Sequence, residues 1–226
     1  MRPMSKLQTL RWPLLALILL LAWDASGLDL WAMRLVGDAQ GFAWRDLWVT
    51  KSLIHEGGRL VSYAAMIFIV AVNLVPRLLP ALTRRERIWW LLTTLVCLAL
   101  ISLIKRASLT SCPWDLTEFG GAAQYVSHWA WGRRDGGGGH CFPSGHASAA
   151  FAYLAGAWAL ARAYPRAARA WGVAVVVLGV IYGLGQMVRG AHYPSHTMWT
   201  GWLCWAATVL AAQVGPWRLR RAAAAG

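Results

Sequence analysis

The amino-acid sequence predicts an all-α protein, a polytopic membrane helix bundle with about six transmembrane helices. Two observations lead to this class. Only 14% of the 226 residues are charged and 58% are hydrophobic, whereas soluble domains carry about a quarter charged residues. Charge-free apolar runs also recur along the chain, and roughly 20 such residues cross a bilayer. We therefore interpret residues 1–226 as a single membrane-embedded domain.

Each predicted span is an apolar run without charge. Five of them lie at 60–75, 88–104, 147–161, 170–188 and 197–215. A sixth and weaker run at 12–23 follows Arg2, Lys6 and Arg11. A basic start and a short apolar core also fit a secretory signal peptide. Because five further spans follow, we prefer a retained first membrane anchor.

The positive charge of the chain lies mostly on one side of the predicted membrane. The N-terminus is placed in the cytoplasm and the spans alternate. The cytoplasmic cations are then Arg2, Lys6, Arg11, Arg77, Arg84, Arg85, Arg87, Arg162, Arg166, Arg169, Arg218, Arg220 and Arg221, against the single acid Glu86. This asymmetry follows the positive-inside rule. The net charge of +13 is thus a topology signal, and no nucleic-acid partner is expected.

Two outer segments connect the spans. Residues 24–59 mix apolar side chains with charged ones such as Asp29 and Arg34, a pattern typical of short amphipathic helices at a membrane surface. Gly57-Gly58 is expected to interrupt the chain before the next span.

The longest outer loop, 105–146, contains a run of four glycines and is expected to be pliable. Cys112 and Cys141 bracket this loop, while Cys97 and Cys204 fall inside apolar spans. The outer face of a bacterial inner membrane is oxidising, so we expect a disulfide between Cys112 and Cys141. In the chain-entropy model this bond contributes roughly 3.5 kcal/mol.

The tetrapeptide Pro143-Ser144-Gly145-His146 opens the span at 147–161. The first N–H groups of a helix have no internal partner and its dipole is positive there, so a helix start can bind an anion. His146 can exchange a proton near neutral pH. A helix cap beside an ordinary histidine is the alternative interpretation.

A second cluster lies at the outer corner between the last two spans, where Arg189, His192 and His196 surround Pro194. Pro194 should end one helix, and Ser195 is suited to cap the next. Ionisable groups at membrane depth are functional candidates. The alternative is three side chains that reach the membrane interface without a further role.

These stretches resemble the motifs of the type 2 phosphatidic acid phosphatase family of membrane lipid phosphatases. The family's first motif has Lys and, seven residues on, Arg-Pro, where this chain has Lys105 and Cys112-Pro113. The second motif, Pro-Ser-Gly-His, is intact. The third motif reads Ser-Arg, five residues, His, three residues, Asp. It corresponds here to Gly185-Gln186, five residues, His192, three residues, His196.

The resemblance implies a role for each matching residue. His192 attacks phosphorus and becomes a phosphohistidine, and His146 protonates the leaving group. Lys105, the Ser144 hydroxyl and the Gly145 N–H stabilise the extra negative charge. No metal or other cofactor is implied, and the partner is a phosphorylated lipid.

Three positions depart from the family pattern. Cys112 and Gln186 replace two phosphate-binding arginines, and His196 replaces the Asp that orients the nucleophile. Arg189 lies about one helical turn after Gln186, so it can reach the same point. Arg106 is the first candidate to replace the other arginine, with Arg133 and Arg134 as alternatives.

Two alignments of the third motif compete for the nucleophile. In the first, His192 attacks, and a neutral His196 accepts its hydrogen bond in place of the missing Asp. In the second, His196 attacks, which puts Arg189 seven residues upstream and Thr200 at the Asp position. A hydroxyl supports a developing imidazolium less than a carboxylate does, so we prefer His192.

The sequence therefore predicts a phosphatase in a bacterial inner membrane, with its active site facing the periplasm. It would hydrolyse a lipid's phosphate or diphosphate headgroup. The alternatives are a lipid phosphotransferase, or a catalytically degenerate binder or transporter of lipid phosphates. Undecaprenyl diphosphate, lipid A, phosphatidylglycerol phosphate and phosphatidic acid are equally compatible substrates.

Overall fold

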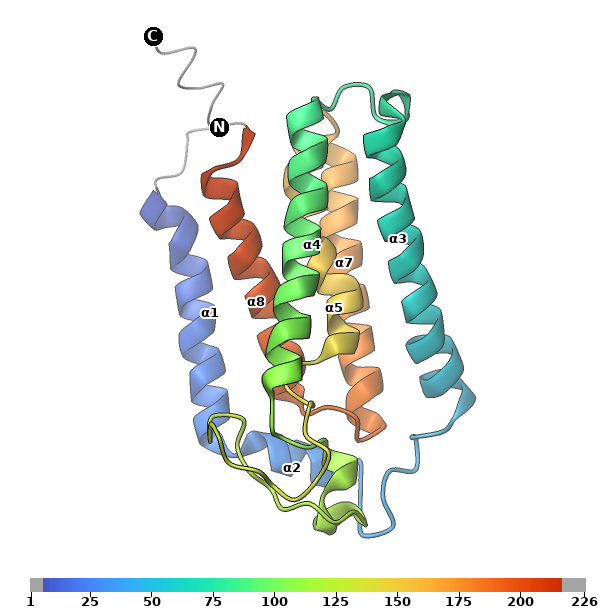
Figure 1. The fold of residues 1–226 in the computed structure, drawn as a ribbon, viewed down its shortest axis with the longest axis vertical. Coiled ribbons are helices and arrows are strands. Elements are labelled where there is room, and N and C mark those ends of the chain that lie inside the picture. The colour runs from blue at the N-terminus through green and yellow to red at the C-terminus, as the bar shows by residue number, and fades with distance from the viewer. Residues whose placement is uncertain (1–5, 217–226) are drawn as a thin grey trace.

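The computed structural model describes residues 6–216, and no strand occurs within that range. Its long helices stand side by side along one axis (Figure 1). They are α1 (Lys6–Ser26), α3 (Gly57–Leu74), α4 (Arg84–Ala107), α7 (Pro165–Val188) and α8 (Pro194–Gln213). The predicted all-α class is confirmed, and every predicted apolar run is mainly helical.

The chain contains helices that can cross a membrane. Within the described range, three are long and apolar enough: Val49–Leu74, Arg84–Ala107 and Pro165–Val188. A fourth span results if the bent pair Arg11–Ser26 and Leu28–Arg34 is counted as one. These helices indicate a membrane protein.

Large apolar side chains point outward from these helices. Ile18, Ile67, Leu103 and Val173 are 63%, 68%, 64% and 63% exposed, respectively. Exposed apolar surface on this scale marks a partner or a membrane, and hydrocarbon is its favourable environment when it covers whole helices. The bundle thus presents a lipid-facing surface around a packed interior.

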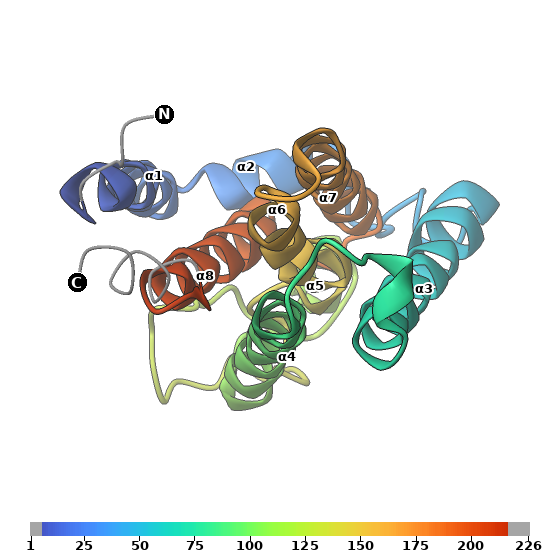
Figure 2. The same ribbon diagram turned by 90° about the horizontal axis from the view of Figure 1, so that it is seen from above.

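The predicted span at 147–161 is a broken helix at the centre of the bundle. It consists of α5 (Gly145–Phe151), a 3₁₀ turn η5 (Ala152–Leu154) and α6 (Ala155–Leu160). Figure 2 shows α5 and α6 enclosed by α4, α7 and α8. At the break, the Tyr153 carbonyl accepts a hydrogen bond of 2.8 Å from Trp171 Nε1. A side chain that intrudes at a helix break is a common cause of such kinks.

The outer segments differ from the expected surface helices. Only α2 (Leu28–Arg34) is a separate short α-helix. A π-helical segment, η1 (Val49–Glu56), continues directly into α3, so the expected interruption at Gly57-Gly58 is wrong. The physical reason is that both glycines keep helical backbone angles, and at Gly58 the Tyr182 ring leaves no room for a larger residue.

The long loop is anchored despite its glycines. The buried Asp135 carboxylate accepts hydrogen bonds from the Ser111 N–H and hydroxyl and from the Gly137 N–H. A small apolar core, formed by Met33, Phe42, Leu116, Phe119, Ala123 and Tyr193, joins this loop to α2 and to the α7–α8 corner. The loop is therefore held against the end of the bundle by its own side chains. The glycine run alone predicted a pliable loop.

The connections alternate between the two ends of the bundle. The start of α1, the end of α8 and the α3–α4 and α6–α7 connections share one end (Figure 1). The α2 helix, the long loop and the α7–α8 corner share the other. This matches the alternation assumed in the charge count. Arg2, Arg218, Arg220 and Arg221 of that count lie outside the described residues.

This alternation predicts that the long loop and the C-terminus lie on opposite sides of the membrane. A reporter that is active only outside the cytoplasm should be active when fused after Gly137 and inactive when fused at the C-terminus, because the positive-inside rule sets the orientation. Equal reporter activity at both points would contradict this topology.

Candidate active site

Residues from three separate stretches meet at the end of the bundle where α4 ends and α5 begins. The charges of Lys105 and His146 both act on His192, and the charge of Arg189 acts on His146. The Lys105 side chain also covers the start of α5: a Cβ added at Gly145 would lie 3.2 Å from Lys105 Cδ. The structure therefore brings most of the predicted site residues together.

Ser144 is the N-cap of α5, the helix cap that was the alternative interpretation of this tetrapeptide. Its Oγ accepts a hydrogen bond of 3.3 Å from the Ala147 N–H. Its own N–H donates to the His196 carbonyl at 3.1 Å, and the Thr200 hydroxyl donates to its carbonyl at 3.0 Å. The helix start that carries the Gly145 N–H is thereby fixed to the first turns of α8.

The α7–α8 corner differs in one detail from the expected geometry. Helix α8 begins at Pro194 with Tyr193 as its N-cap, so Ser195 is not the cap. The Ser195 side chain lies within the first turn and donates instead to the Asp29 carboxylate of α2. The buried Asp29 carboxylate thus places a negative charge and a hydrogen-bond acceptor beside the first N–H groups of α8, as a capping side chain would.

His192 is buried in the α7–α8 corner. Its Nδ1 lies 3.5 Å from Cys141 Sγ and 3.5 Å from His196 Nδ1. Burial lowers the pKa of His192 well below its usual value, and the nearby Lys105 charge lowers this pKa further. The imidazole is therefore neutral near pH 7, so it carries the lone pair that a nucleophile needs.

His196 does not accept a hydrogen bond from His192 as the sequence suggested. Its Nδ1 lies 3.0 Å from the Cys141 carbonyl oxygen, which can only accept, so this nitrogen donates. A hydrogen bond to the Cys141 backbone also supports the protonated form of His192. The Cys141 backbone is thus the candidate orienting partner of His192, and His196 Nδ1 is not its acceptor.

The structure contains the predicted disulfide between Cys112 and Cys141. Within the described range, Cys112, Cys141 and His192 form the one group with metal-ligand spacing. Two of its three members are joined in the disulfide and offer no thiolate. We therefore assign no metal to this position.

The two candidate phosphate-binding arginines are placed differently. Arg189 donates from Nε to the Arg45 carbonyl at 2.8 Å, and its Nη1 is buried without a hydrogen-bond partner in the described part of the chain. This N–H is available to an anion. Arg106 is exposed at the end of α4, and its predicted site role stays a prediction.

One residue of the cluster, His55 of η1, was missed in the sequence. Its ring stacks on that of His146 with centroids 4.5 Å apart. Gln186 Nε2 lies 3.1 Å from His55 Nδ1. The sequence signal for His55 is that an ionisable residue lies directly before a membrane span. The residue pattern of 24–59 instead favoured surface helices.

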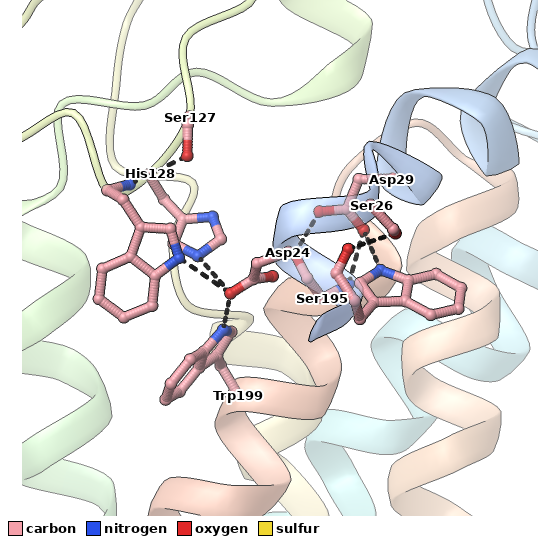
Figure 3. Close-up of polar contacts among 9 residues, drawn as sticks. Asp24, Ser26, Asp29, Ser127, His128, Ser195 and Trp199 are labelled. Carbon is pink, nitrogen blue, oxygen red and sulfur yellow. Dashed lines mark hydrogen bonds and ion pairs between the residues drawn. The ribbon is translucent and has the colours of Figure 1, made fainter. Parts of the chain in front are cut away.

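Two buried carboxylates attach α1 and α2 to the first turns of α8 (Figure 3). Asp24 pairs with His128 at 3.3 Å and accepts from Trp199 Nε1 at 2.8 Å. Asp29 accepts the Ser195 N–H at 3.0 Å and also the Ser195 hydroxyl.

Comparison with known proteins identifies the family. The family model for the PAP2 superfamily matches residues 86–220. No curated protein and no solved structure matches the chain. The match covers more than half of the 226 residues and includes all three motif regions.

The Asp29 contact predicts a measurable stability loss. In an Asp29→Asn variant, an amide NH₂ replaces one acceptor oxygen and faces a buried donor. We expect a cost of about 2 kcal/mol and a lower unfolding temperature in detergent. Tryptophan fluorescence on heating measures it, with the exposed Asp38→Asn as the matched control. Equal unfolding temperatures for the two variants would contradict the role of Asp29.

Proposed function

The chain belongs to the PAP2 superfamily, whose members are generally phosphatases, and on that premise we propose that it is a membrane lipid phosphatase. It would remove phosphate from the ester or diphosphate headgroup of a lipid. One observation carries this proposal. The neutral His192 is buried beside Lys105, whose positive charge lowers the His192 pKa further, and it shares the cluster with His146 and His55. Such a pocket suits a phosphate.

The proposed reaction begins with attack of the His192 imidazole on phosphorus. The bond to the lipid oxygen breaks, and His146 gives a proton to that leaving oxygen. Lys105, the Gly145 N–H and Arg189 stabilise the charge on the phosphoryl oxygens. The product of this step is a phosphohistidine and a dephosphorylated lipid.

The second step of the proposal returns the free enzyme. A water molecule attacks the phosphohistidine, and His146, now neutral, takes a proton from it. The bond between phosphorus and His192 breaks, and inorganic phosphate leaves. The Cys141 carbonyl holds the His192 ring in one orientation throughout, which is the function of the missing aspartate.

The lipid nature of the substrate is supported by the position of the site. The cluster lies at the end of helices whose sides expose large apolar residues, so a lipid headgroup can reach it from the bilayer surface. We propose six passes, formed by α1, α3, α4, the broken α5–α6 helix, α7 and α8. The positive-inside rule then puts the site at the periplasmic face of a bacterial inner membrane.

Two single substitutions test the nucleophile. His192→Ala should remove both activity on phosphorylated lipids and the acid-labile phosphoenzyme, because the attacking atom is gone. His196→Ala should leave activity that is about 10- to 100-fold lower, since it removes one hydrogen bond to the carbonyl that orients His192. Trapping of the phosphoenzyme in His192→Ala, with its loss in His196→Ala, would reverse the two roles.

The donor set predicts activity without a divalent metal. Positive charge comes from Lys105 and Arg189, and the one group with metal-ligand spacing in the described residues includes the disulfide. We expect the purified protein to release phosphate at the same rate with and without EDTA. Activity that EDTA abolishes and Mg²⁺ or Zn²⁺ restores would show that a metal takes part.

A further inference from the structure

We propose that His55 is a further substrate-contacting residue, which donates a hydrogen bond from Nε2 to the phosphate, and that Gln186 positions it. The pair would stand in for the arginine that the third motif lacks at position 186. This inference rests on the proposed phosphatase function, since it concerns the same pocket.

The ring of His55 lies directly against the proposed acid. It stacks on His146 with centroids 4.5 Å apart and an interplanar angle of 25°. The preceding carbonyl, of Ile54, lies 3.3 Å from His146 Nε2 and accepts its hydrogen bond. One short segment of the chain therefore contacts His146 through both a side chain and the backbone.

Gln186 sets the tautomer of His55. The Gln186 amide nitrogen lies 3.1 Å from His55 Nδ1, and an NH₂ group can only donate. The lone pair of neutral His55 is therefore on Nδ1 and its proton on Nε2. Gln186 is buried and occupies the position of the arginine in the third motif. In this proposal it acts on the phosphate through the His55 side chain.

The backbone is shaped so that η1 can approach α5 and α7 closely. A Cβ at Gly185 would lie 2.6 Å from Ile54 Cγ2, and a Cβ at Gly58 would lie 2.9 Å from the Tyr182 ring and 3.2 Å from His146 Nε2. Only glycine fits at both contacts. In addition, η1 is π-helical, a rare geometry that is frequent at functional sites.

The charges around His55 favour an anion. Arg189 acts on both His55 and His146, and Arg59 acts on both as well, while Glu56 is the one acid acting on His55. The buried Arg189 Nη1 has no hydrogen-bond partner in the described residues. A phosphate oxygen that reaches this guanidinium would give the His55 Nε2–H an acceptor too.

Three variants of His55 separate a hydrogen-bond donor from a packing residue. His55→Phe keeps the stacked ring and loses the donor, whereas His55→Gln loses the ring and keeps an N–H near the Nε2 position. His55→Ala loses both. We expect vanadate, a phosphate analogue, to bind roughly 10- to 100-fold more weakly to the Phe and Ala variants. The Gln variant should recover part of this loss.

Gln186 is tested through its dependence on His55. Gln186→Met removes the amide donor, so the lone pair of His55 is no longer held on Nδ1 or its proton on Nε2. It should weaken vanadate binding in the wild-type background and have little further effect in a His55→Phe background. Additive effects would show that Gln186 acts independently of His55. Lys51→Gln, an exposed change in the same π-helix, is the matched control.

Vanadate binding is followed by tryptophan fluorescence and compared with phosphate release from phosphorylated lipids. If the wild type binds vanadate and releases phosphate while His55→Phe equals it in both, the role of His55 is overturned and the phosphatase proposal stands. A wild type that binds vanadate without any turnover would overturn the phosphatase proposal. The comparison of vanadate binding between the wild type and His55→Phe would then still decide the role of His55. Failure to bind vanadate at all would overturn both.

Discussion

The hydrogen bonds between the 141–144 segment and the α7–α8 corner hold the candidate site together. The Cys141 carbonyl accepts from His196, and the Ser144 N–H donates to the His196 carbonyl. The disulfide from Cys141 to Cys112 ties the same segment to the start of the long loop. Because the helix start, the buried histidines and the loop share this one segment, a shift in any of them would move the others.

The second constraint is the placement of the few acids. The chain has nine Asp and Glu residues against 22 Lys and Arg. The buried acids are engaged in structural contacts: Asp24 and Asp29 attach α1 and α2 to α8, and Asp135 anchors the loop. The candidate site gathers Lys105, Arg189 and several imidazoles, while Glu56 acts on both His55 and Arg189 from its edge. Burial and the nearby Lys105 charge lower the pKa of His192, which keeps its imidazole neutral for the proposed attack on phosphorus.

The motif positions that depart from the family pattern have acquired other partners. Cys112, at an arginine position, forms the disulfide that lies against His192. Gln186, at the second arginine position, contacts His55 of η1. Arg189 brings a guanidinium to the cluster from three residues further along. The departing motif positions are therefore engaged with other parts of the chain.

The sequence by itself determined the helices, the alternation of the connections, the disulfide and the start of α5 at the second motif. These features depend on local composition, on charge and on spacing along the chain. Only the tertiary structure decided that His55 joins His146, that Ser195 pairs with Asp29 and that His196 donates to Cys141. His55 and Gln186 are 131 residues apart. This contact depends on how η1 packs against α7, and no pattern within either segment predicts that packing.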